Sequence, residues 1–246
     1  MGALSGIRVL DLSRVLAAPL AAQTLADLGA EVIKIERPGS GDESRTYGPP
    51  FLKDRDGRST GIAAFYLACN RGKKSVTVDH STAEGQQILR ELAAQSDVVL
   101  ENFRAGALKK YGLDHERLRA LNPRLVYCSI TGFGQDGPYA KRPGYDGIFQ
   151  AMGGLMSANG HPEEPMKVGI SMVDVLTSLH AVIAILAALR HRDQVSGSGQ
   201  YIDLSLLDCG TSPDTSQFIA KCDSEATPQS SSDRSMYWPL PDTWSR

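Results

Sequence analysis

The segments Ile7-Arg-Val-Leu-Asp-Leu12, Ala17–Leu28 and Glu31-Val-Ile-Lys-Ile-Glu36 decide the fold. The first and last are short apolar runs rich in valine and isoleucine, which predicts strands. The middle segment is rich in alanine and leucine and predicts a helix, with Gly29 at the position of a C-terminal cap. A strand, a helix and a second strand in succession are typical of a parallel α/β sheet.

The same alternation continues along the chain. Further strands are predicted at Ser75–Asp79, Asp97–Glu101, Arg124–Ile130 and Gln200–Leu206, and long helices at about 82–95 and 173–190. Ser81 is the expected N-cap of the first of these helices, because Glu84 three residues later completes a capping box. The sequence therefore predicts an α/β fold, a Rossmann-like open parallel sheet with flanking helices.

The composition is that of an ordinary globular protein. The 246 residues are 41% hydrophobic and 22% charged, with a formal net charge of −2. This charge provides no long-range attraction for nucleic acid or for an anionic membrane, so neither is an expected partner. The four cysteines lack CxxC spacing, which argues against a zinc or disulfide scaffold and favours a reducing compartment.

The chain carries no evident targeting or membrane segment. Its first residues run directly into a strand pattern and show no secretory signal. The longest apolar stretch, Val175–Leu189, is interrupted by polar residues, so we expect a buried core helix there rather than a membrane span. A cytoplasmic location is the expectation that follows.

Basic residues follow several of the predicted strands. In an open α/β sheet, ligands bind beyond the carboxyl ends of the strands. The loops there and the residues before the third strand carry these basic side chains: Arg14, Arg37, Arg45, Arg71, Lys73, Lys74, Arg104 and Arg142. Guanidinium groups bind phosphate oxygens in bidentate fashion, so the pattern favours a phosphate-bearing ligand. A solvated loop is the alternative interpretation for residues 71–74.

Common catalytic and nucleotide motifs are missing from the sequence. No GxGxxG or GxxxxGK[ST] pattern follows a strand, which argues against a dinucleotide or P-loop site. The histidines are scattered and form no HExxH, so no metal site is expected. The sequence also lacks the GxSxG turn that α/β-hydrolases use.

Asp174 is the most informative carboxylate, because it begins the most apolar predicted helix. The interpretation that the residues alone favour is an N-terminal cap, in which its carboxylate accepts backbone N–H bonds. The other is a nucleophile, since a carboxylate held ionised at a helix N-terminus in an apolar site is competent for attack. The two roles are compatible, and the residues alone leave both open.

Several stretches in the same order resemble one family. They are Gly6-Ile-Arg-Val-Leu-Asp-Leu-Ser13, Asp27-Leu-Gly-Ala-Glu-Val-Ile-Lys-Ile-Glu-Arg-Pro38, Val99-Leu-Glu-Asn-Phe-Arg-Ala-Gly106, Val168-Gly-Ile-Ser-Met-Val-Asp174 and Gly199-Gln-Tyr-Ile-Asp-Leu-Ser-Leu-Leu-Asp208. Together they resemble the class III CoA-transferases, the CaiB–BaiF family, from about residue 3 to residue 209. The resemblance implies a cytoplasmic dimer of acyl-CoA metabolism that moves coenzyme A between carboxylic acids.

The resemblance also implies a set of site residues. Asp174 matches the family's nucleophile, which forms an acyl anhydride and then an aspartyl-CoA thioester. The coenzyme A contacts carry over to Val15, Leu16, Ala17, Arg37, Lys73, Asn102, Phe103, Lys110 and Tyr145. The expected partners are an acyl-CoA and an acceptor carboxylic acid, possibly a dicarboxylic one, with Arg104 and Arg142 as cations suited to it. Coenzyme A is then a substrate, and no prosthetic group or metal is expected.

Two alternatives to the transferase are kept. The family's racemase subgroup acts on 2-methylacyl-CoA thioesters and carries a His where this chain has Tyr145, so racemisation would lack one of its two bases. The second alternative is a catalytically inactive CoA-binding relic. It follows from the expectation that the chain is truncated or frameshifted at its C-terminal end.

That expectation rests on where the family pattern stops. Residues 1–209 match the large, CoA-binding region, whereas 210–246 form a Ser/Pro-rich tail that contains Trp238 and Trp244 and has no apolar periodicity. Loop or disorder is predicted for this tail. The family's second, smaller domain and its glycine-rich loop have no counterpart in this pattern, so the homodimer and full competence are expectations for the family and not for this short chain.

Overall fold

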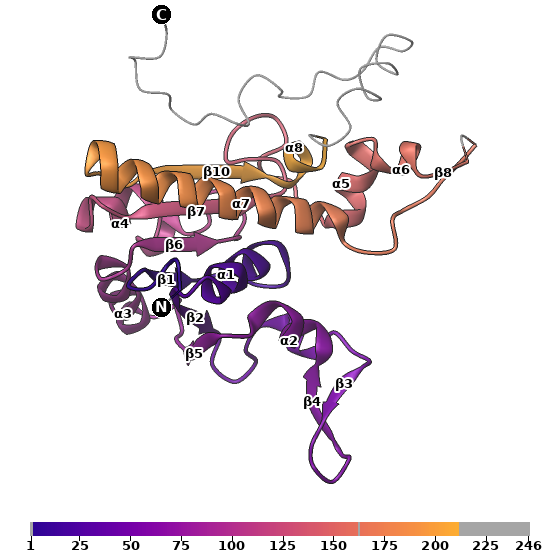
Figure 1. The fold of residues 1–246 in the computed structure, drawn as a ribbon, viewed down its shortest axis with the longest axis horizontal. Helices are drawn as coiled ribbons and strands as arrows, with labels where there is room; N and C mark the ends of the chain where they lie inside the picture. The colour runs from indigo at the N-terminus through magenta and orange to yellow at the C-terminus, as the bar shows by residue number, and fades with distance from the viewer. Residues whose placement is uncertain (1, 162, 212–246) are drawn as a thin grey trace, which may run out of the picture.

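The computed structural model describes residues 2–161 and 163–211, and its centre is a six-stranded sheet (Figure 1). The strand order is β10-β7-β6-β1-β2-β5, and every neighbouring pair is parallel. The strands are β1 (Arg8–Asp11), β2 (Glu31–Glu36), β5 (Lys73–Thr77), β6 (Val98–Glu101), β7 (Val126–Thr131) and β10 (Tyr201–Ser205). The predicted open parallel α/β sheet is therefore confirmed.

Helices cover both faces of this sheet. They are α1 (Ala17–Asp27), α2 (Ala64–Asn70), α3 (Ala83–Ala94), α4 (His115–Leu121), α5 (Asp146–Met152), α6 (Leu155–Ala158), α7 (Met172–His191) and α8 (Leu206–Thr211). Helices α1 and α7 pack against each other on one face, and α3 and α4 lie on the other (Figure 1). The antiparallel hairpin of β3 (Phe51–Lys53) and β4 (Ser59–Ala63) projects away from the sheet.

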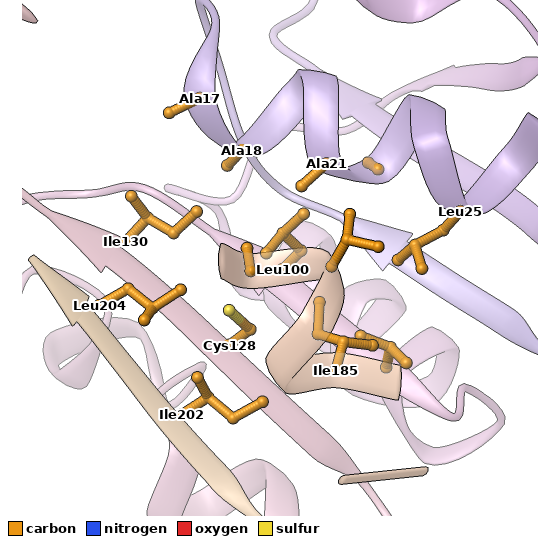
Figure 2. Packing of buried hydrophobic residues seen from close by; sticks show 14 of the residues in the cluster. Ala17, Ala18, Ala21, Leu25, Leu100, Cys128, Ile130, Ile185, Ile202 and Leu204 are labelled. Carbon is orange, nitrogen blue, oxygen red and sulfur yellow. The ribbon is translucent and has the colours of Figure 1, made fainter. Parts of the chain in front are cut away.

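The larger hydrophobic core lies between the sheet and the α1–α7 pair. Small side chains such as Ala18 and Ala21 let α1 approach the strands closely, and Ile185 of α7 fills the space beside them (Figure 2). All three side chains are fully buried. A second core on the opposite face includes Leu89 of α3 and Leu118 of α4. Strand residues therefore face an apolar layer on both sides, as buried parallel strands require.

Helix α7 is the chain's most apolar element. The segment Met172–Ser196 is long and apolar enough to cross a membrane, by length and composition only. In the structure it packs along α1 and the sheet, and residues such as Val173, Ala181 and Ile185 are buried in the core. The predicted core helix is thus present at this place.

Helix ends differ from the sequence predictions in one informative way. Thr82, not Ser81, is the N-cap of α3, and its hydroxyl accepts the backbone N–H of Gly85 at 3.0 Å. Ser81 instead bonds the side chain of Asp79. By contrast, Gly29 has a φ of +103°, the left-handed conformation that its predicted role as a C-terminal cap requires.

The strand order creates a switch point between β1 and β6. From β1 the chain runs outward through β2 and β5, whereas β6, β7 and β10 extend the sheet in the opposite direction. The loops that leave β1 and β6 therefore diverge to opposite faces and open a crevice, which is where ligands bind in such sheets. Cys69, Cys128 and Cys209, the cysteines among the described residues, are free and buried.

Candidate functional site

Two adjoining cavities lie at the carboxyl ends of the strands. The Arg37 cavity, of about 430 Å³, is lined by residues that include Arg37, His80 and Phe103. The Asp174 cavity, of about 510 Å³, is lined by residues that include Asp174 and Tyr145. The two share the lining residues Arg14, Glu43, Phe103 and Arg104. The two cavities are therefore neighbours at the switch point of the sheet.

The structure brings most of the predicted contact residues to these cavities. Seven of them line the Asp174 cavity: Val15, Leu16, Ala17, Asn102, Phe103, Tyr145 and Asp174. Phe103 also lines the Arg37 cavity, which contains the eighth residue, Arg37. Lys73 and Lys110 line neither cavity. The predicted site is thus assembled from loops that lie far apart in sequence, with two of its lysines left out.

Lys73 occupies a structural position instead. Its side chain is 1% exposed and donates to Asp11 Oδ2, to the Pro19 carbonyl and to Asn70 Oδ1, each at 2.8 Å. All of its donors are therefore used inside the protein, and none is available for a phosphate. Lys110 lies on the surface, with its ammonium 4.6 Å from the centre of the Tyr111 ring.

The turn between β1 and α1 is held in an unusual conformation. Val15 has a φ of +70°, which a β-branched residue adopts only where its surroundings impose it. Asn102 binds both the N–H and the carbonyl of the neighbouring Arg14, at 2.8 and 2.7 Å. Asn102 therefore fixes this turn through its side chain, in addition to lining the cavity.

A buried ion pair supports the same turn from below. Lys34 Nζ lies 2.9 Å from Asp42 Oδ2 and donates to the Ser13 carbonyl at 2.8 Å. Asp42 Oδ1 accepts the N–H of Val15 at 3.3 Å and that of Ser44 at 2.9 Å. Both charged side chains are at most 1% exposed. The charges from β2 and the loop after it therefore set the backbone that lines the Asp174 cavity.

The Arg37 cavity combines aromatic faces with positive charge. The His80 ring meets Phe103 and Tyr111 edge-on, with centroids 5.4 and 5.1 Å apart. The Arg14 guanidinium lies 5.2 Å from the centre of the Phe103 ring. Burial lowers the pKa of His80, and the nearby Arg37 and Arg14 lower it further, against the opposing effect of Asp79. A flat ring beside cations is suited to a nucleotide.

Asp174 is in the first turn of α7 but is not its cap. Ser171 is the N-cap residue and makes no side-chain capping bond. The helix end is capped from another element, because Asp146 Oδ1, at the start of α5, accepts the N–H of Val173 at 2.7 Å and that of Asp174 at 3.1 Å. Of the two interpretations of Asp174, the cap of its own helix is therefore excluded, and the carboxylate makes no capping bond.

The carboxyl of Asp174 has an altered acidity. Desolvation in the cavity wall raises its pKa from 3.8 to about 7, and the negative charge of Asp146 adds to the rise. The sequence-based expectation of a carboxylate held firmly ionised by a helix N-terminus is therefore replaced by one poised near neutral pH. Such a group is poorly solvated when ionised, which favours nucleophilic attack.

Basic side chains predicted at the strand ends divide into two groups. Arg45, Arg71 and Lys74 pair with Glu36, Asp27 and Glu31 and do not line either cavity. The remaining cations, Arg14, Arg37, Arg104 and Arg142, line the cavities. Positive charge in the site thus comes from arginines alone among the described lining residues.

A polar network beneath the site was not predicted from the sequence. Glu101, Ser129 and Asp203 lie side by side in register at the ends of β6, β7 and β10. Gln135 joins them to the loop after β6, because it donates to Ser129 and Asp203 and accepts the N–H of Gly106 at 3.2 Å. Burial raises the pKa of Glu101 to about 7. This network ties together two loops that line the cavities.

Asp146 is the functional residue that sequence reasoning missed. It is 6% exposed, and Gln150 donates to its second carboxylate oxygen. No local motif marks a residue that caps a helix more than twenty positions away, so only the packed structure reveals it. Across residues 2–161 and 163–211, no group of three or more His, Cys, Asp or Glu side chains is arranged to hold a metal ion.

Comparison with known proteins gives a consistent match. The model of CoA-transferase family III matches residues 4–244. A succinate–glutarate CoA-transferase of Agrobacterium fabrum is 55% identical over 206 residues, which are 83% of this chain and 51% of that protein. A succinyl-CoA–D-citramalate CoA-transferase of Chloroflexus aurantiacus is 43% identical over 204 residues, which are 82% of this chain and 49% of that protein.

A solved structure gives the same result. A CaiB/BaiF family protein from Brucella suis superposes with a TM-score of 0.85 at 50% identity, covering 93% of this chain and 59% of that one. The chain spans about half the length of the curated relatives it matches. The family match runs past the predicted boundary at residue 209, and the predicted tail lies outside the described residues from 212 onward. That boundary stays a prediction.

Proposed function

Because this chain belongs to CoA-transferase family III, we propose that it transfers coenzyme A from an acyl-CoA thioester to an acceptor carboxylic acid, with Asp174 as the nucleophile. One observation carries the proposal. A desolvated carboxylate with a pKa of about 7 lines a cavity that shares four lining residues with a second, arginine-rich cavity with aromatic walls. The pair of compartments fits a molecule with a reactive acyl end and a phosphorylated nucleotide end.

Coenzyme A would lie across the two cavities. The adenine nucleotide fits the Arg37 cavity, where Phe103 and His80 supply ring faces and Arg37 supplies charge. The thioester fits the Asp174 cavity, beside the Val15 turn and the N-terminus of α1. Arg14 and Arg104, which line both compartments, lie where the phosphates between the two ends of the molecule would pass.

The chemistry then follows from the carboxylate. An Asp174 oxygen attacks the thioester carbonyl carbon, the C–S bond breaks, and CoA thiolate leaves a mixed anhydride behind. The thiolate attacks the Asp174 carbonyl carbon, releasing the donor acid as its carboxylate and forming an aspartyl-CoA thioester. The acceptor carboxylate attacks this thioester, and the displaced thiolate then takes the acyl group from the second anhydride, which regenerates Asp174. Excluding water keeps both anhydrides from hydrolysing.

The substrates that we propose are dicarboxylic acids and their CoA thioesters. The two relatives described above are named for succinate with glutarate and for succinyl-CoA with D-citramalate, and all of these acids carry two carboxyl groups. The Asp174 cavity is lined by three arginines against two carboxylates, Glu43 and Asp174. The excess positive charge suits a substrate that keeps one free carboxylate after the other has formed the thioester.

The site offers less support for racemisation. That reaction needs two groups that exchange a proton with the carbon next to the thioester. Tyr145 stands where the racemase subgroup has a His, and its side chain is 71% exposed. A phenol hydroxyl lacks the basic ring nitrogen of an imidazole and is a poor substitute for it as a proton acceptor.

The test is to trap the covalent intermediate on the full chain. Incubation with glutaryl-CoA should increase the intact mass by that of CoA less one water, and hydroxylamine should release the CoA and leave only the small added mass of a hydroxamate on Asp174. The Asp174→Ala variant should bind CoA with an affinity within about threefold of the parent and show no addition. Binding of CoA without any adduct on the parent chain would favour the inactive relic. Exchange of the α-proton with solvent deuterium in the absence of an acceptor would favour the racemase.

A further inference from the structure

The Asp174 cavity has one cation that the other cavity does not share. Arg14 and Arg104 line both compartments, whereas Arg142 lines the Asp174 cavity alone. We propose that Arg142 is the specificity residue of the site and binds the distal carboxylate of a dicarboxylic acyl group. This assignment rests on the proposed function and adds to it the residue that selects the substrate.

Arg142 is anchored to the core through a ladder of aromatic rings. Phe149 is fully buried, and the Phe133 ring meets it edge-on with centroids 5.2 Å apart. Tyr139 packs on Phe133 in the same way at 5.5 Å, and the Arg142 guanidinium lies 4.1 Å from the centre of the Tyr139 ring. Each member is positioned by the one before it. The cation is therefore held in place even though it belongs to a loop.

The contact with the Tyr139 ring restrains the guanidinium, and no hydrogen bond to the described residues uses its N–H donors. An arginine that lies over a ring keeps its N–H donors at the edge of its plane, where a carboxylate can bind with two parallel bonds. No carboxylate of the described residues forms an ion pair with Arg142, whereas Arg14 lies 4.0 Å from Glu43. Arg142 thus presents an uncompensated, oriented cation to the cavity of the nucleophile.

The chemistry of the substrates calls for such a group. In a succinyl or glutaryl thioester, one carboxyl is bound to sulfur and the other remains ionised at neutral pH. That anion must enter the same cavity as the thioester, and leaving it unpaired there would cost binding energy. A monocarboxylic acyl group of equal length has a methyl group at this position and gains nothing from Arg142.

The test compares two thioesters that differ mainly in the distal carboxylate. Glutaryl-CoA and pentanoyl-CoA are titrated into the full chain, the Arg142→Ala variant and the Arg142→Lys variant, each carrying Asp174→Ala so that no chemistry consumes the ligand. Free CoA serves as a third ligand. Arg142→Ala should weaken glutaryl-CoA about tenfold or more and leave pentanoyl-CoA and CoA within about twofold. Arg142→Lys should restore part of the lost affinity, since lysine keeps the positive charge but lacks the paired N–H donors of the guanidinium.

A matched control comes from the neighbouring arginine. Arg104→Ala should weaken all three ligands by a similar factor, because Arg104 lines both compartments. Thermal unfolding of each variant checks that the fold is kept. If Arg142→Ala weakens the two thioesters equally or neither of them, the assignment of Arg142 is wrong while the proposed function stands. If the Asp174→Ala parent binds none of the three ligands, the proposed function itself fails.

Discussion

The carboxylate of Asp146 on α5 accepts the backbone N–H of Asp174 on α7 at a distance of 3.1 Å. One side chain thereby caps the helix that carries the proposed nucleophile and places a negative charge beside it. The first effect fixes the position of Asp174, and the second contributes to its raised pKa. Position and acidity of the nucleophile are thus controlled by the same residue, and substitutions can separate them.

Asp146→Asn should lower the pKa of Asp174 from about 7. The amide oxygen still accepts the two backbone N–H groups of α7, but the neighbouring charge is gone, so ionisation of Asp174 becomes easier. The pKa can be measured by NMR titration of the chain with ¹³C-labelled aspartate. Asp146→Ala is the companion variant, which also loses the cap and should unfold with about 1 kcal/mol less free energy. An unchanged or higher Asp174 pKa in Asp146→Asn would contradict the coupling.

Asp174→Asn should stabilise the protein at alkaline pH and not at acidic pH. The folded pKa of Asp174 is raised to about 7 from 3.8, so the unfolded chain releases this proton first. The free energy of unfolding contributed by Asp174 therefore falls as the pH rises from about 4 to about 7, and the loss persists above that range. Urea unfolding should show a gain of about 1–3 kcal/mol for the variant at pH 8. The gain should disappear near pH 4, and a gain of equal size at both pH values would contradict the prediction.

Lys34→Met should be strongly destabilising. Removing this ammonium leaves Asp42 as a buried charge without its partner, which costs about 3–5 kcal/mol of unfolding free energy. Lys74→Met is the matched control on the adjacent strand, because Lys74 is 70% exposed and its pair with Glu31 is worth about 0–1 kcal/mol. Urea denaturation of both variants measures the difference. Similar costs for the two would mean that the Lys34–Asp42 pair does not support the Val15 turn as described.

Local sequence patterns were sufficient for the sheet. The segment 31–36 was predicted as a strand and forms β2 over the same residues, because its three β-branched residues, Val32, Ile33 and Ile35, favour a strand. The helix predicted at about 173–190 is α7, which extends over Met172–His191. Where short-range periodicity and burial agree, the sequence alone predicts the element.

Predictions that depended on partners were less accurate. A capping role in α7 was one of the two interpretations of Asp174, and the cap comes instead from Asp146, which only the packing of α5 brings near. Lys73 was expected at the ligand, and a buried pair with Asp11 holds it away. In both cases the sequence identifies a charged side chain near the site, but the tertiary structure determines which partner that side chain binds.

The ladder that carries Arg142 illustrates the same limit. Phe133, Tyr139, Arg142 and Phe149 are spread over a loop and the helix after it, with no period that would indicate contact. Their order in space follows from how the loop after β7 folds back over α5. A sequence shows that an arginine is present near a strand end, but its orientation depends on this fold.

The buried cysteines bear on what the released thiolate of coenzyme A can react with. Cys69, Cys128 and Cys209 are enclosed, and desolvation raises the pKa of each thiol, so none of the three is a ready partner for disulfide exchange. In the proposed reaction, a CoA thiolate released in the site would therefore meet carbonyl carbon as its electrophile and no accessible cysteine of the described residues. Oxidising conditions would not join it to any of these three thiols, so coenzyme A would not be trapped on them as a mixed disulfide.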